Sequence, residues 1–120
     1  MEEYKLGTVE SRFADIIWQH EPLYSRELVA LCQQQLNWKK PTTYTVLRKL
    51  CERGIFQNVD GMVSSILSRQ EFYARQSEQF VEDAFGGSLP AFLAAFTTRK
   101  SLSPTEVEEI RKMIASCGGE

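Results

Sequence analysis

The chain has few of the residues on which metal sites, disulfides and catalysis depend. Its 120 residues include one histidine, His20, and three cysteines, Cys32, Cys51 and Cys117, none of them in a Cys-x-Cys or Cys-x-x-Cys pair. An odd number of widely spaced cysteines argues against a disulfide framework and for a reducing cytoplasm, and it offers no usual set of metal ligands. A glycine-rich phosphate loop and a recognisable nucleophile motif are also missing. We therefore expect no metal, no cofactor and no catalytic residue.

Long apolar runs are missing as well. No segment approaches the roughly 18 apolar residues that a membrane span requires. Residues 1–5 lack the basic and then apolar pattern of a secretory signal, so we expect no such signal and no direct association with a membrane. With 42% hydrophobic and 25% charged residues, the composition is that of a folded soluble protein. The length suits one domain, or one small domain with an appendage.

What the chain does have is a cationic stretch with helical periodicity, from Trp38 to Gly54. Five lysines and arginines against one carboxylate give this stretch a charge of +4, whereas the whole chain carries −2. At helical spacing, one side is apolar and consists of Thr43, Val46, Leu47 and Leu50. The opposite side is basic and rich in hydroxyls: Pro41, Thr42, Tyr44, Thr45, Arg48 and Lys49. Such a surface is either a solvated helix face or a recognition helix that lies in the major groove of DNA.

The segments around this stretch favour the recognition helix. Two helices are predicted before it, at about 8–18 and 25–36. Two short runs of β-forming residues follow it, 55–59 and 62–67, and they are joined by Asp60-Gly61, which is a strong hairpin signal. Three helices and then a hairpin is the order of a winged helix-turn-helix. We therefore predict a mainly α fold with a small β-hairpin wing (α+β), in which residues 1–67 form a DNA-binding domain.

The second half is helical and unusually aromatic. Helices are predicted after capping boxes at 68–71 and 103–106, with a short helix at 89–96 and a polar connection at 97–101 between them. Five of the seven phenylalanines lie between residues 72 and 96. Three short helices in about 50 residues cannot bury that much aromatic surface alone. This half packs either on the first half or on a second copy, and we predict the latter: residues 68–120 form a helical dimerisation region, with Phe80, Phe85, Phe92 and Ile110 in or beside the interface.

Three motifs together resemble the BlaI/MecI/CopY penicillinase-repressor family. They are Ile16-Ile-Trp18, Trp38-x-x-x-Thr42-x-x-Thr45-x-Leu47-x-Lys49-Leu50-x-x-x-Gly54 and Leu102-Ser-x-x-Glu106. The similarity extends from about Gly7 to Ile114. It implies a cytoplasmic, homodimeric winged-helix repressor that binds a palindromic, inverted-repeat operator in double-stranded DNA.

Two functions remain open for the cationic helix. As a DNA-binding helix, it would contact phosphates through Lys39, Lys40 and Arg48, and base edges through Thr42, Tyr44, Thr45 and Lys49. Alternatively, the chain is a winged-helix module that binds a protein and not DNA. The acidic overall charge and a hairpin without arginine favour this alternative.

The chain departs from the family pattern in three places. The wing sequence Gly61-Met-Val-Ser-Ser-Ile66 lacks the arginine that often follows the glycine. The metal-binding tail of the copper-responsive members is missing, since Cys117 stands alone. In the β-lactam repressors a membrane sensor leads to cleavage of an Asn-Phe bond, and the matching pair here is Ala95-Phe96, at the end of the predicted 89–96 helix. The resemblance therefore implies a possible cleavage site and a sensor protease system, while a small ligand or a partner protein is the alternative inducer.

Overall fold

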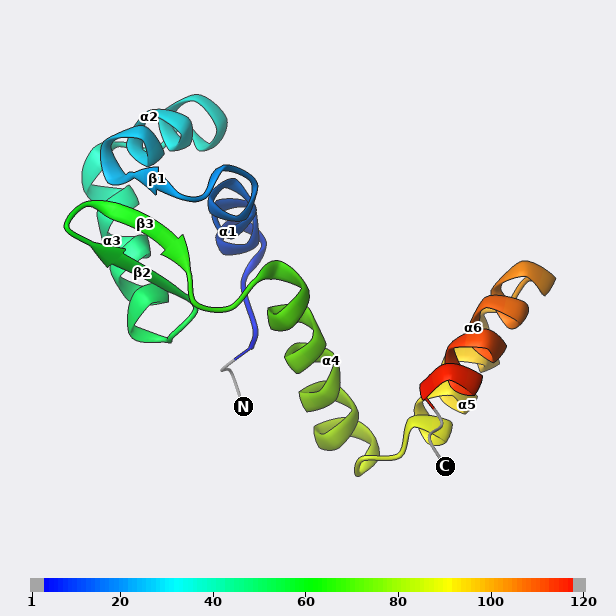
Figure 1. The fold of residues 1–120 in the computed structure, drawn as a ribbon. Helices are drawn as coiled ribbons and strands as arrows, with labels where there is room; N and C mark the ends of the chain where they lie inside the picture. Colours follow the sequence, from blue (N-terminus) through cyan, green and yellow to red (C-terminus); the bar gives the residue numbers. More distant parts are fainter. Residues whose placement is uncertain (1–3, 118–120) are drawn as a thin grey trace. The chain divides into compact units, whose positions relative to one another are not determined.

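The computed structural model describes residues 4–117, and in these far more residues lie in helices than in strands (Figure 1). In chain order the elements are α1 (Thr8–His20), β1 (Leu23–Tyr24), α2 (Ser25–Leu36), α3 (Lys40–Glu52), β2 (Phe56–Val59), β3 (Met62–Ser65), α4 (Arg69–Phe85), α5 (Leu89–Arg99) and α6 (Pro104–Cys117). The chain divides into two compact units, Met1–Gln79 and Phe80–Glu120. Their boundary lies inside α4. The predicted winged helix-turn-helix, mainly α with a small sheet, is the fold of the first unit.

The hydrophobic core lies in the first unit. Among the described residues, every buried hydrophobic side chain falls between Phe13 and Phe72. The helices contribute side chains from successive turns to it: Phe13 and Ile17 from α1, for example, and Leu28 and Cys32 from α2. In Figure 1, α3 lies behind the sheet, α2 above it and α1 to its right, with α3 in contact with β2 and α1 in contact with β3.

The sheet is antiparallel, in the order β1-β3-β2. The predicted hairpin is confirmed: Val59 pairs with Met62, and the turn residues Asp60 and Gly61 have φ angles of 53° and 85°. Positive φ at both positions is the type I′ turn, whose twist matches that of the strands. The strand β1 is an addition that local sequence signals did not predict, and it pairs Tyr24 with Met62.

The first turns of α4 pack on the core of the first unit. Phe72 is fully buried, and its ring lies 5.8 Å from that of Trp18 and 6.1 Å from that of Tyr4. The Trp18 indole Nε1 donates to the Leu67 carbonyl at 3.0 Å. Gln76 Nε2 donates to the Tyr4 carbonyl at 2.7 Å, so Tyr4 is also hydrogen-bonded to α4. By packing, the first unit thus includes residues beyond 67; the functional division into 1–67 and 68–120 stays a prediction.

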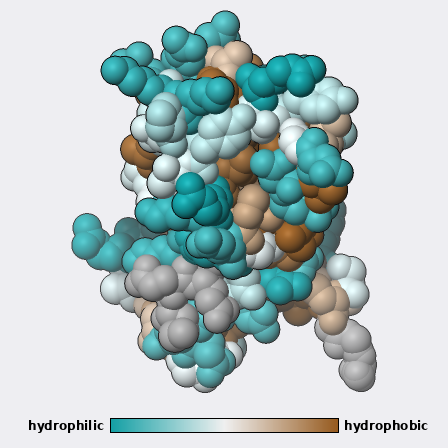
Figure 2. Space-filling view, turned by 90° about the vertical axis from the view of Figure 1, so that its left-hand side faces the viewer, coloured by the Kyte–Doolittle hydropathy of each residue, from teal (hydrophilic) through white to brown (hydrophobic). Residues whose placement is uncertain are grey.

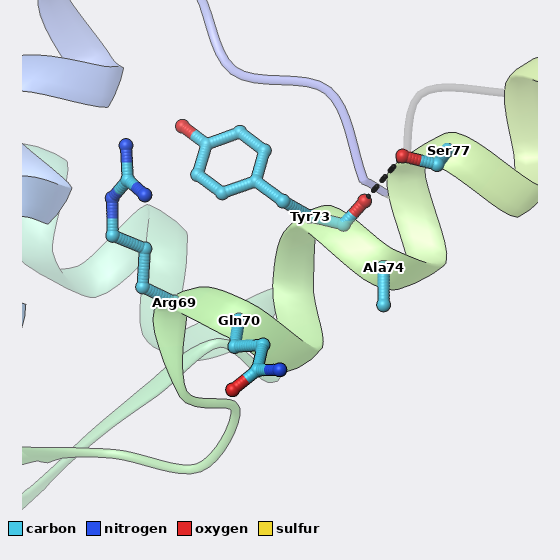
Figure 3. Close-up of a pocket in the computed structure, with 5 residues that line it drawn as sticks. All are labelled: Arg69, Gln70, Tyr73, Ala74 and Ser77. Carbon is cyan, nitrogen blue, oxygen red and sulfur yellow. Dashed lines mark hydrogen bonds between the residues drawn. The ribbon is translucent and has the colours of Figure 1, made fainter. Parts of the chain in front are cut away.

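An open hollow of about 580 Å³ lies along this part of α4 (Figure 3). It is lined by Arg69, Gln70, Tyr73, Ala74 and Ser77. The Arg69 guanidinium lies over the Tyr73 ring at 4.9 Å and donates to Asp15 Oδ1 at 3.0 Å, whereas Ser77 Oγ donates to the Tyr73 carbonyl. The Arg69 and Ser77 side chains are thus hydrogen-bonded within the protein.

The second unit has no fully buried side chain among its described residues. The rings of Phe80, Phe85 and Phe92 form a cluster with centroids 5.7 to 6.1 Å apart. Six large apolar side chains of this unit remain exposed, including Phe80 of the cluster itself: Phe80, Leu89, Phe96, Val107, Met113 and Ile114. Of the five phenylalanines between residues 72 and 96, Phe72 is therefore buried on the first unit, while none of the other four is fully buried.

The helix α5 is longer than the sequence predicted. It continues to Arg99, so the expected polar connection at 97–101 begins only at Lys100. The last turn of this helix is exposed, and within it the Thr97 and Thr98 hydroxyls donate to the Leu93 and Ala94 carbonyls, at 2.7 and 2.9 Å, one turn earlier. The Ala95-Phe96 peptide therefore lies within the helix and not at its end.

We predict that Phe72→Ala destabilises the first unit. Removing a fully buried phenylalanine side chain costs about 3–5 kcal/mol through lost transfer free energy and the cavity that remains. Urea unfolding followed by tryptophan fluorescence measures this, because Trp18 contacts Phe72. The matched control is Val9→Ala on α1, whose side chain is half exposed and whose loss should change the unfolding midpoint little. Equal effects of the two substitutions would contradict the assignment of this part of α4 to the first unit.

Candidate nucleic-acid interface

The start of α3 is fixed by an aromatic contact. Trp38 stacks on Phe13 of α1, with ring centroids 5.4 Å apart and an angle of 28° between the planes. Lys39 is the N-cap residue and has an extended backbone. Pro41 lies in the first turn, where its missing N–H leaves no hydrogen bond unmade. The indole thus holds the beginning of the helix against the core, while Lys39 and Lys40 remain exposed.

The end of α3 is a Schellman motif. Gly54, with a φ of 81°, donates to the Cys51 carbonyl, and Ile55 donates to the Leu50 carbonyl. A positive φ favours glycine at this position. The Arg53 side chain turns away from the exposed face and donates from Nη2 to the Lys5 carbonyl at 2.8 Å. Of the cations that the sequence analysis counted, Arg53 therefore serves to hold the N-terminal segment.

The two predicted sides of α3 are present. Thr43, Leu47 and Leu50 are buried, and Val46 is half-buried. The opposite side is exposed and contains six of the seven residues predicted to contact DNA: Lys39, Lys40, Thr42, Thr45, Arg48 and Lys49. Thr45 Oγ1 donates to the Pro41 carbonyl at 2.9 Å, which leaves the oxygen lone pairs free to accept.

The seventh residue, Tyr44, is placed differently. It is half-buried, and its hydroxyl donates to Ser25 Oγ at the start of α2, at 3.0 Å. Its ring also lines a hollow of about 330 Å³ between α3 and β2, together with Arg48 and Asn58. Tyr44 is thus directed toward α2 and the sheet, while its neighbours Thr42 and Thr45 face solvent.

The cations of α3 have no acidic partner among the residues that the structure describes. Within residues 4–117, Lys39, Lys40, Arg48 and Lys49 form no ion pair, whereas Arg69, Arg75 and Arg111 each pair with a carboxylate. Figure 2 faces the side on which the hairpin turn lies in Figure 1, and hydrophilic residues cover most of that surface. Cations without an ion pair can neutralise phosphates without first breaking a salt bridge within the protein.

The wing carries no cation. Residues 56–65 contain neither lysine nor arginine, and Asp60 is the one charged residue of the hairpin. On its outer face, Tyr24, Met62 and Val59 form a row across the three strands, as the register requires. Beside this row, the Arg26 guanidinium lies 4.5 Å over the Tyr24 ring. Arg26 and Ser25 were not predicted as part of the site, because their proximity to the wing depends on the pairing of β1 with β3.

The cysteines near α3 are in the protonated form at neutral pH. Burial raises the pKa of the Cys32 thiol to about 11 and raises the pKa of the Cys51 thiol as well. A protonated thiol is a poor nucleophile and a poor metal ligand. In the described part of the chain, no group of three His, Cys, Asp or Glu side chains could hold a metal ion. Nor is any helix there long and apolar enough to cross a membrane.

These features define the class of protein: a winged helix-turn-helix with an unpaired cationic face on its third helix, followed by a helical unit with exposed apolar side chains. The sequence pattern described as "Penicillinase repressor" matches residues 6–116. The chain therefore belongs to the penicillinase repressor family, as its motifs predicted.

Two relatives illustrate how far the similarity reaches. The "Methicillin resistance regulatory protein MecI" of Staphylococcus aureus (strain Mu50) is 23% identical over 115 residues, which cover 92% of this chain and 94% of that protein. The "Penicillinase repressor" of Bacillus licheniformis is 19% identical over 114 residues, covering 92% and 89%. These relatives are regulatory proteins and not enzymes by name, and the general function that the family supports is transcription regulation.

We predict a clear order of thiol reactivity with a disulfide reagent at pH 8. Cys117 is exposed and should react within seconds to minutes, Cys51 more slowly, and Cys32 last, because its thiol is buried and its pKa is raised to about 11. Cys117→Ser should remove the fast phase alone. A fast phase that persists in this variant would mean that the core around α3 opens readily.

Proposed function

We propose that this chain is a homodimeric transcriptional repressor that binds an inverted-repeat operator through α3. The observation that carries the proposal is the exposed, unpaired cationic face of α3 in a member of a repressor family. Lys39, Lys40 and Arg48 would contact phosphates, and these contacts would position the helix in the major groove. Thr42, Thr45 and Lys49 would contact base edges and thereby select the sequence. Double-stranded DNA in the cytoplasm is the proposed partner.

The second unit supports the homodimer. Phe80 and Phe96 are about half exposed, and Ile114 more so, which is unusual for large apolar side chains. A second copy would cover this surface, with Phe80, Phe85, Phe92 and Ile110 in or beside the interface. Because a dimer with two-fold symmetry presents two identical α3 helices, its operator would be an inverted repeat with half-sites about one helical turn, or a multiple of it, apart.

Derepression would act on the second unit. Cleavage of Ala95-Phe96 through a membrane sensor system is one route, but this peptide lies within α5, and the Phe96 carbonyl accepts the Lys100 amide at 3.2 Å. A protease needs an extended backbone, so cleavage would require the last turn of α5 to unfold first. A small ligand or a partner protein that separates the two copies is the other route.

A second function has one observation in its favour. The hairpin without cations and its outer row of Tyr24, Met62 and Val59 would suit a protein partner better than a phosphate backbone. A salt titration of binding to duplex DNA separates the two functions. Phosphate neutralisation gives a steep dependence on salt, which a protein-binding module lacks.

We predict that Lys40→Ala and Thr45→Ala weaken operator binding in different ways. Loss of a phosphate contact at Lys40 should weaken binding to all sequences alike and reduce the salt slope by about 1. Loss of a base contact at Thr45 should cost about 1–3 kcal/mol and relax the preference at one base pair. Selection from random duplexes, followed by fluorescence anisotropy at several salt concentrations, measures both effects. The control is Lys112→Ala, an exposed lysine on α6, and parent-like binding by both α3 variants would refute the assignment.

We predict a dimer of about twice 13.8 kDa by light scattering at micromolar concentration. Phe80→Asp should shift the protein toward the monomer, because a charge would then lie on the apolar surface that the second copy covers. The control is Val59→Asp in the wing, at a position as exposed as Phe80, which should leave the mass unchanged. A parent protein that is monomeric under these conditions would exclude the proposed dimer.

A further inference from the structure

A chain of hydrogen bonds connects α3 with the turn of the wing. The Tyr44 hydroxyl donates to Ser25 Oγ at 3.0 Å, and the Ser25 backbone N–H donates to the Gly61 carbonyl at 2.7 Å. Gly61 is the second residue of the hairpin turn, and Ser25 is the first residue of α2. Three separate segments of the sequence therefore meet at one serine.

The surroundings of this serine leave it little freedom. Its neighbour Tyr24 pairs with Met62, which directly follows the turn, and the Tyr24 backbone N–H donates to Glu27 Oε1 at 2.8 Å. The start of α2 is thus fixed to the sheet on one side. The Tyr44 hydroxyl fixes it to α3 on the other side.

The wing has a particular need for such a connection. A hairpin with lysine or arginine can attach itself to phosphates, but residues 56–65 here have neither, and the turn carries Asp60. The position of this turn beside α3 must then be fixed by the protein itself. Tyr44 is half-buried and directed away from the exposed face of α3, so it can fix the position of the turn through Ser25.

We propose that Tyr44 is a positioning residue for DNA binding: through Ser25 it holds the wing turn at a fixed place relative to α3, so that both meet the DNA as one rigid surface. This inference rests on the proposed function. It assigns to Tyr44 an indirect role in place of a base contact. It also adds Ser25, which lies outside the cationic stretch, to the residues on which affinity depends.

The test uses the full chain and four variants: Tyr44→Phe, Ser25→Ala, the double variant, and Ser25→Thr, which keeps the hydroxyl. Affinity is measured for the duplex selected by the parent, and base preference is measured at every position of that duplex. Amide hydrogen exchange of Ser25 is measured without DNA, because this N–H forms the bond to the Gly61 carbonyl.

The expected result has three parts. Tyr44→Phe and Ser25→Ala each weaken binding about three- to tenfold, as the loss of one hydrogen bond implies. The double variant is no weaker than either single variant, because both remove the same connection. The Ser25 amide exchanges faster in Tyr44→Phe, in Ser25→Ala and in the double variant. Ser25→Thr behaves like the parent, and the base preference is unchanged at every position.

Other results overturn the inference. If Tyr44→Phe relaxes the preference at one base pair while Ser25→Ala binds as the parent does, Tyr44 contacts a base. If the effects of the two substitutions add, the residues act independently. If the parent binds no duplex, the proposed function fails, and the role of Tyr44 in DNA binding fails with it. If the Ser25 amide exchanges no faster in Tyr44→Phe than in the parent, the connection from Tyr44 through Ser25 to the wing turn is rejected, whatever the protein binds.

Discussion

The packing of one side of α3 is the constraint on which the rest of the site depends. Burial of Leu47 and Leu50, with Trp38 stacked on Phe13 at the start, sets the rotation of the helix about its axis. Because helical side chains repeat every 3.6 residues, fixing the apolar side also fixes which residues face outward. The exposed row of lysines, arginine and threonines is thus produced by the core. A substitution inside the core that rotated α3 by one residue would move the cationic row by about 100°.

The two units use aromatic residues in opposite ways. In the first unit, the Trp18 ring contacts the rings of Phe56 and Phe72, and Phe72 is fully buried. In the second unit, the cluster of Phe80, Phe85 and Phe92 is incomplete, and none of these rings is fully buried. A complete core gives one unit a fixed surface for recognition. An incomplete core means that any molecule that covers the exposed rings would stabilise the other unit.

Features with a local cause could be predicted from the sequence, and features with a distant cause could not. The side chains of α3, the turn at Asp60-Gly61 and the end of α3 at Gly54 depend on residues only a few positions apart. The strand β1 has two residues and exists because β3, some forty positions later, pairs with it. The contact between Tyr44 and Ser25 depends on that arrangement, so Tyr44 resembled a residue of the exposed face. The predicted end of α5 is too early because an exposed run of polar residues fits the last turn of a surface helix as well as it fits a connection.

The turn of the wing also limits how this protein can change over evolutionary time. Asp60 and Gly61 both have positive φ, a conformation that asparagine, aspartate and glycine adopt readily and that lysine and arginine adopt only with strain. A single substitution at the tip can therefore remove the negative charge, for example by asparagine, but cannot place a cation there without cost to the fold. A wing that acquires a phosphate contact must acquire it on the strands, at positions such as Val59. The backbone conformation of Asp60 and Gly61 thus limits which charged residues the tip of the wing can carry.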